Sequence, residues 1–162
     1  MSDISRTSVK TLLGIAVRAE IDSSKIYSNI AKKVSNPLLQ EKFKMLAFEE
    51  KKHKNVLEKI SKFLFKGEEI QIPDKTDERL LPSIKMSPSS SLVDIIYQAM
   101  EAEKAAQIFY ETLSKRFQKP QKDILIYLGK VEKSHYMMLK SEYALAQEFE
   151  DYAEKDIDKI IT

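Results

Sequence analysis

The chain of 162 residues contains no cysteine, which excludes disulfide bonds, thiolate metal sites and a catalytic thiol. Its formal net charge is only +2 although 32% of its residues are charged, so it lacks the basic surface typical of nucleic-acid-binding proteins. With 43% hydrophobic residues, three glycines and five prolines, the composition predicts one compact domain over residues 1–162 that is built from long helices.

Helix-breaking residues divide this domain into four predicted helices. Pro37 and Pro120 are each expected at the first position of a helix, and Ser91 is expected to be an N-cap with Asp94 closing a capping box. The predicted helices cover residues 7–35, 37–66, 91–118 and 120–149, with a crossover connection at 67–90 and an acidic C-terminal tail at 150–162.

No stretch of the chain has the sequence of a membrane span or a signal peptide. The apolar run at 12–17 is short and is interrupted after it by Arg18 and Glu20, and nothing approaches the roughly 20 apolar residues of a membrane helix. We therefore expect a cytoplasmic protein that contacts neither membrane nor nucleic acid.

The hydrophobic stripes of the helices repeat from the first half of the chain to the second. Polar residues interrupt these stripes at matching places, at Glu20 and Tyr27, Glu50 and His53, Glu103 and Tyr110, and Glu132 and His135. The offset is 83 positions between Glu20 and Glu103 and 82 between Glu50 and Glu132. This pattern predicts an all-α four-helix bundle made of two duplicated helical hairpins.

The connection at 67–90 is too long for a turn and long enough to run the length of the bundle. Such a crossover makes the second and third helices parallel. This is the ferritin-like arrangement of four helices.

Six of the inward polar residues are predicted to lie at one depth of the bundle, about 20 to 25 Å from the two hairpin joints at ~1.5 Å per residue. They are Glu20, Glu50, His53, Glu103, Glu132 and His135. Four buried carboxylates repel one another unless cations neutralise them, so the pattern predicts a site for two divalent ions. Iron, manganese and zinc all suit these ligands.

Four further residues near these positions each have two alternative roles. Tyr27 and Tyr110 either donate hydrogen bonds to ligand carboxylates or belong only to the core. Glu49 and Glu101 point away from the stripes, and we expect them to be solvated or to support a ligand from behind.

The sequence resembles the rubrerythrins of the ferritin-like superfamily through "AVRAEIDSSKIYSNIA" with "FEEKKHKNVL", and through "AMEAEKAAQIFYETL" with "VEKSHYMML". The resemblance implies that Glu50 and Glu132 bridge two iron ions, with the other four residues of the cluster as terminal ligands. It also implies an enzyme that reduces hydrogen peroxide, protects against oxidative stress and forms a homodimer.

Two departures from the rubrerythrin pattern affect these expectations. The chain lacks the four cysteines of a rubredoxin module, so a separate electron-donor protein is expected. Met100 and Ala106 stand one turn on either side of Glu103, where typical members have an additional carboxylate, so redox-linked ligand exchange is in question.

The sequence is compatible with several functions and with two conformations of the C-terminal tail. The oxidant is either hydrogen peroxide or dioxygen, and the alternatives are ferritin-like iron oxidation and storage or a metal-stabilised helical interaction module without redox activity. The C-terminal tail either extends the fourth helix and packs on a neighbouring subunit or frays. Its apolar residues for such packing are Phe149, Tyr152, Ile157 and Ile160.

Overall fold

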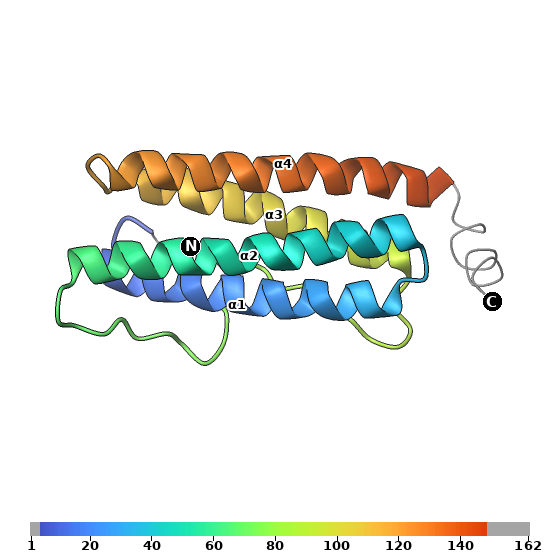
Figure 1. The fold of residues 1–162 in the computed structure, drawn as a ribbon, viewed down its shortest axis with the longest axis horizontal. Helices are drawn as coiled ribbons and strands as arrows, with labels where there is room; N and C mark the ends of the chain where they lie inside the picture. The colour runs from blue at the N-terminus through green and yellow to red at the C-terminus, as the bar shows by residue number, and fades with distance from the viewer. Residues whose placement is uncertain (1–3, 149–162) are drawn as a thin grey trace.

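The computed structural model describes residues 4–148, and this part of the chain contains four helices and no strand (Figure 1). The helices are α1 (Val9–Lys33), α2 (Pro37–Leu64), α3 (Leu92–Ser114) and α4 (Gln121–Glu148). The predicted all-α fold is therefore confirmed. The interpretation of the C-terminal tail, including Phe149, falls outside the described residues.

The helices form two antiparallel hairpins, α1 with α2 and α3 with α4 (Figure 1). The crossover connection leaves α2 at one end of the bundle and enters α3 at the opposite end. As a result α2 and α3 run in the same direction, as in ferritin-like bundles.

Side-chain caps set the starts of three helices. Asn36 Oδ1 accepts the backbone N–H groups of Leu38 and Leu39, with Pro37 as the first helical residue. Ser91 Oγ accepts the N–H of Asp94 at 3.1 Å and begins α3 as predicted, and Ser8 caps α1 in the same way. These caps satisfy N–H groups that have no partner within the helix.

Pro120 differs from its predicted position, because it precedes α4 instead of opening it. The Lys119–Pro120 peptide bond is cis, and the helix begins at Gln121. The carbonyl of Pro120 accepts the N–H groups of Asp123 and Ile124 at 3.1 and 3.2 Å. Pro120 thus supplies the acceptor for the first turn from outside the helix.

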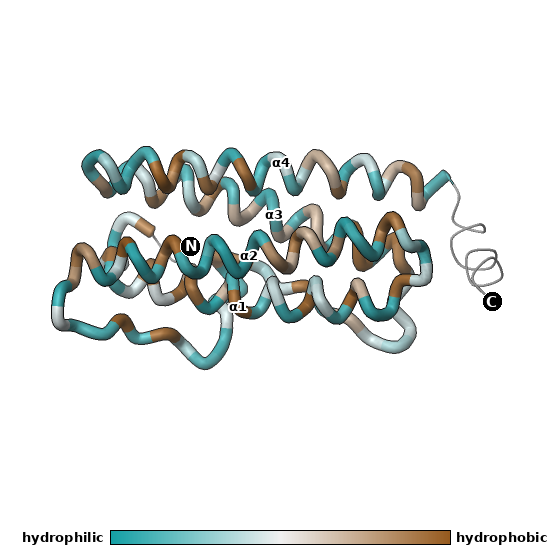
Figure 2. Tube along the Cα trace, in the orientation of Figure 1, coloured by the Kyte–Doolittle hydropathy of each residue, from teal (hydrophilic) through white to brown (hydrophobic). Residues whose placement is uncertain are grey.

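The core consists of two hydrophobic clusters. One contains Phe43, Ile96 and Leu139, and the other contains Leu13 and Leu125. Hydrophobic and hydrophilic residues alternate along all four helices, as expected when one face of each is buried (Figure 2). In the part of the chain that the structure describes, no helix has the length and apolar character needed to cross a membrane.

The crossover approaches α1 so closely at Gly14 that no side chain fits there. A Cβ atom at Gly14 would lie 2.2 Å from the carbonyl oxygen of Gln71 and 3.2 Å from its carbonyl carbon. Since both are backbone atoms, no rotamer change of a side chain would relieve the contact. Gly14 therefore allows the crossover to lie directly against α1.

We expect Gly14→Ala to lower the free energy of unfolding by about 1–3 kcal/mol, although alanine favours a helix over glycine. Gly129→Ala in α4 is the matched control, since its Cβ would meet the flexible Glu111 side chain at 3.2 Å. That variant should remain within about 1 kcal/mol of the parent protein. Urea unfolding measures both, and equal stability of the two variants would contradict the close contact.

Candidate metal centre

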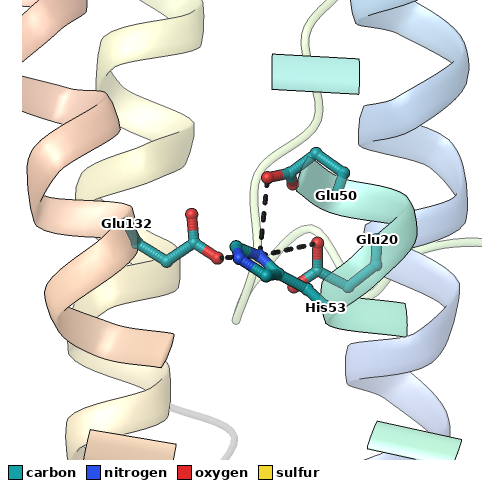
Figure 3. Close-up of side chains that lie close together, drawn as sticks. All are labelled: Glu20, Glu50, His53 and Glu132. Carbon is teal, nitrogen blue, oxygen red and sulfur yellow. Dashed lines mark ion pairs between the residues drawn. The ribbon is translucent and has the colours of Figure 1, made fainter. Parts of the chain in front are cut away.

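The six predicted ligand residues meet inside the bundle. Glu20 comes from α1, Glu50 and His53 from α2, Glu103 from α3, and Glu132 and His135 from α4. None of them is more than 5% exposed. Figure 3 shows Glu20, Glu50 and Glu132 around the His53 ring. The helices of both hairpins thus contribute to a single polar cluster.

The cluster contains two groups of potential ligands. One group is Glu20, Glu50, His53 and Glu132, and the other is Glu50, Glu103, Glu132 and His135. Within each group, one nitrogen or oxygen atom from every residue lies within 4.8 Å of the others. Glu50 and Glu132 belong to both groups, which is the arrangement expected of residues that bridge two ions.

Glu132 lies between the two histidines. Its Oε1 atom is 2.8 Å from His53 Nδ1, and its Oε2 atom is 3.1 Å from His135 Nδ1. Glu50 Oε1 is 3.6 Å from the Nδ1 atom of each histidine. The imidazole rings are stacked with their centroids 5.9 Å apart. Both Nδ1 atoms therefore face the shared carboxylates.

Several buried atoms of the cluster have no hydrogen-bond partner among the described residues. They are Glu20 Oε2, Glu50 Oε1, His53 Nδ1, Glu103 Oε2 and Glu132 Oε1. A buried carboxylate or imidazole without such a partner is unfavourable. The atoms belong to residue types that bind iron, manganese or zinc. The residues present therefore fit a pair of metal ions.

Tyr27 and Tyr110 bind ligand residues of the opposite hairpin. The hydroxyl of Tyr27 in α1 donates to Glu103 Oε1 in α3, and the hydroxyl of Tyr110 in α3 donates to Glu20 Oε1 in α1. Burial raises the pKa of both tyrosines well above the ordinary value, so they remain donors. Each tyrosine leaves the Oε2 atom of its carboxylate free for a metal.

Of the two alternatives expected for Glu49, the structure shows the second, in which it supports a ligand from behind. Its Oε2 atom is 2.5 Å from His135 Nε2, on the opposite side of the ring from the shared carboxylates. Its side chain is 33% exposed, and Glu101 is exposed. At the 82-residue offset the counterpart of Glu49 is Val131. The repeat therefore provides no counterpart, for His53, of the carboxylate that contacts His135 Nε2.

We expect Glu49→Gln to weaken the binding of one metal ion by about tenfold or more, because carboxylates behind a ligand histidine orient the ring and raise its basicity. The second ion should be affected less, since His53 has no corresponding carboxylate. Isothermal titration calorimetry with Fe(II) under anaerobic conditions measures the affinities of the two metal sites. Glu101→Gln removes an exposed carboxylate and is the control, and equal affinities in both variants would contradict a role for Glu49.

Burial and mutual repulsion act on the carboxylates. Burial and then the charge of Glu132 raise the pKa of Glu20 to about 7. Burial, followed by repulsion from Glu20 for Glu50 and from Glu103 for Glu132, raises the pKa of Glu50 and Glu132 well above the usual value. Without cations, protons are therefore expected to neutralise part of the cluster.

The histidines and Glu103 respond differently. Burial lowers the pKa of His53. Burial opposes protonation of His135 too, but Glu103 and Glu132 outweigh it and raise the pKa of His135 to about 11. Burial would raise the pKa of Glu103, but contact with His135 lowers it. Both shifts favour a charged pair, and His135 Nδ1 lies 3.4 Å from Glu103 Oε2.

The parallel second and third helices and the buried cluster of glutamates and histidines define a ferritin-like bundle of the diiron-carboxylate class. The family model for rubrerythrin matches residues 11–143. The chain belongs to the rubrerythrin family.

Two solved structures are similar to this chain. A hypothetical protein from Pyrococcus furiosus is 33% identical, with a TM-score of 0.80 over 91% of this chain and 95% of that protein. A protein from Thermotoga maritima that is assigned as a ferritin-like diiron-carboxylate protein is 18% identical, with a TM-score of 0.70 over 85% of this chain and 95% of that one. The second likeness concerns the fold alone. No curated protein matches the chain.

Proposed function

We propose that this protein is a di-iron oxidoreductase that reduces hydrogen peroxide with electrons from a separate donor protein. The observation that carries the proposal is the sharing of Glu50 and Glu132 between two buried ligand groups, each of which has its own histidine. Membership of the rubrerythrin family supports iron as the metal and peroxide as the oxidant.

In this proposal Glu50 and Glu132 would each contribute to holding both ions, because they belong to both ligand groups. Glu20 and His53 complete one side of the centre, and Glu103 and His135 complete the other. When bound, a ferrous pair supplies the two electrons that cleavage of the O–O bond requires.

The surrounding residues orient the ligands and bury them. Tyr27 and Tyr110 orient Glu103 and Glu20 through hydrogen bonds across the two hairpins. The hydrophobic clusters bury the ligand carboxylates within the bundle, and burial strengthens their interaction with cations. Both effects favour a preorganised centre.

The proposal includes two protein partners and a cytoplasmic location. We propose that a separate protein delivers the electrons, since residues 1–162 contain no cysteine that could hold a second redox-active iron. We also propose a homodimer, which is supported by large apolar side chains exposed on α2 and α4, including Phe48 (59%) and Tyr127 (65%). Analytical ultracentrifugation distinguishes a dimer from the hollow shell that iron storage requires.

The test of function is stopped-flow absorbance of the protein loaded anaerobically with two Fe(II), mixed with hydrogen peroxide or with dioxygen. We expect a near-ultraviolet diferric band to grow faster with peroxide than with dioxygen. Faster reaction with dioxygen would indicate an oxidase or a storage protein. The absence of any protein-bound band would favour a metal without redox activity, and metal analysis of the purified protein would identify it.

A further inference from the structure

A pocket of about 280 Å³ connects the metal centre with the surface. It lies among α1, α3 and the crossover, and Glu20, Glu50 and Glu103 are part of its lining. Since Glu20 belongs to one ligand group, Glu103 to the other and Glu50 to both, a molecule in the pocket is adjacent to the centre. The pocket is therefore suited to deliver a substrate.

Apolar side chains form much of the wall. Small residues from the helices, Ala19, Ala102 and Ala106, line it together with larger residues of the crossover such as Leu81 and Ile84. Alanine at these helix positions leaves open a space that a longer side chain would fill. The wall is suited to an alkyl group.

The crossover is fastened beside the pocket. Thr76 Oγ1 donates to Asp22 Oδ2 at 2.6 Å, and Arg18 donates to Asp22 Oδ1 at 2.9 Å. Thr76 and Asp22 both line the pocket. The Thr76 bond joins the crossover to α1, and the Arg18 bond within α1 holds the Asp22 carboxylate in place.

The volume exceeds what hydrogen peroxide needs. Small-molecule sites are typically about 300–1,000 Å³, and one water takes up about 30 Å³ of the liquid. The pocket is near the lower end of the first range and is several times larger than a molecule of four atoms requires. The pocket is lined by four carboxylates and one lysine, Lys25, so its charge disfavours anions. Size, wall and charge together select a small, uncharged, partly apolar ligand.

From this we infer that the substrates include small uncharged organic hydroperoxides, bound with their alkyl group against Ala102 and Ala106. The inference rests on the proposed function and extends its substrate class. In the reaction the O–O bond of ROOH breaks, and the peroxide takes up two protons and two electrons, one from each of two ferrous ions. The products are the alcohol ROH, one water and two ferric ions.

The kinetic test compares tert-butyl hydroperoxide with hydrogen peroxide as oxidants of the anaerobic diferrous protein. We expect the two second-order rate constants to agree within about tenfold. Ala106→Leu should slow the reaction with tert-butyl hydroperoxide by at least about tenfold and the reaction with hydrogen peroxide by less than about threefold, because the added isopropyl group mainly excludes the larger substrate. Ala105→Leu is the control, since Ala105 does not line the pocket.

A second readout does not depend on iron or turnover. Titration of the metal-free protein with tert-butanol, the alcohol product, is followed by ¹H–¹⁵N NMR. In the parent protein and in Ala105→Leu, we expect tert-butanol to shift the amide signals of Ala102 and Ala106 saturably. In Ala106→Leu, we expect it to cause no saturable shift of the amide signals of residues 102 and 106.

The outcomes separate this inference from the proposed function. Rapid oxidation by hydrogen peroxide together with a more than about 100-fold slower reaction with tert-butyl hydroperoxide would overturn the inference and leave the peroxidase intact. Failure of both peroxides would overturn both. Equal effects of Ala106→Leu on the two peroxides, or no saturable shifts with tert-butanol, would also overturn the inference.

Discussion

Glu132→Gln is expected to reduce the binding of Fe(II) from two ions per chain to one at most and to slow oxidation by peroxide by at least about 100-fold. Glu132 is fully buried, and each of its oxygen atoms faces a different histidine. An amide of the same shape supplies one weak oxygen ligand and no negative charge. Metal stoichiometry and the stopped-flow rate measure the two effects.

The same variant separates loss of the metals from loss of the fold. In the metal-free protein, glutamine removes a carboxyl group whose ionisation the buried site opposes, so Glu132→Gln should unfold at a temperature equal to or higher than that of the parent. Glu101→Gln, which removes an exposed carboxylate from α3, should change neither stoichiometry nor rate. Two tightly bound ions in Glu132→Gln would contradict a bridging role.

Metal-free protein is expected to lose at least about 2 kcal/mol of stability between pH 6.5 and 8.5. Glu20 has a pKa of about 7 in the fold against 4.5 in the unfolded chain, so it destabilises the fold increasingly as the pH rises from 4.5 through 7. The raised pKa values of Glu50 and Glu132 act in the same direction.

Above pH 6.5 the histidines do not oppose this loss of stability with rising pH. The pKa of His135 is raised from 6.5 to about 11, so its stabilising effect is complete below 6.5 and is lost as the pH rises toward 11. The lowered pKa of His53 destabilises the fold only as the pH falls below 6.5, and the lowered pKa of Glu103 matters only below 4.5. Between pH 6.5 and 8.5 the change in stability therefore comes mainly from the three carboxylates and His135, all of which lower the stability as the pH rises.

Metal ions should reverse this dependence on pH. They displace the protons of the cluster, so the increase in melting temperature on adding Fe(II) is expected to grow from pH 6.5 to 8.5. When the free Fe(II) concentration is about 100 times the Kd of each of two sites, the free energy of unfolding rises by about 5 kcal/mol. This corresponds to an increase in melting temperature of about 10–20 °C for a chain of this size. Anaerobic thermal unfolding with Fe(II) or with a chelator measures it. A gain that is independent of pH would contradict proton displacement.

The helical periodicity was sufficient to predict which residues face one another inside each hairpin. Glu20, Glu50, His53 and their repeats lie on the hydrophobic stripes because steps of three and four residues return to one face of a helix. The fold followed from the same pattern, since a crossover of that length leaves α2 and α3 parallel. Both inferences needed only distances along the chain.

Helical periodicity does not predict which residues of the two hairpins contact each other. Tyr27 was expected near ligand carboxylates, but its actual partner, Glu103 in the other hairpin, depends on how the hairpins dock. Glu49 lies beside the inward stripe of α2, and its long side chain reaches His135 because α4 is adjacent. The pocket depends on where the crossover lies, which hydrophobic periodicity does not specify.

The crossed bonds of the tyrosines have a consequence for how the molecule opens. Each hairpin holds only half of the polar cluster, and Tyr27 and Tyr110 link α1 with α3 in both directions. The helices pack more closely within each hairpin than between the two. Loss of metal should therefore weaken the boundary between the hairpins first, so that amide hydrogens near this boundary exchange through a partial opening while each hairpin stays folded. The centre would then determine whether the two halves unfold as one cooperative unit.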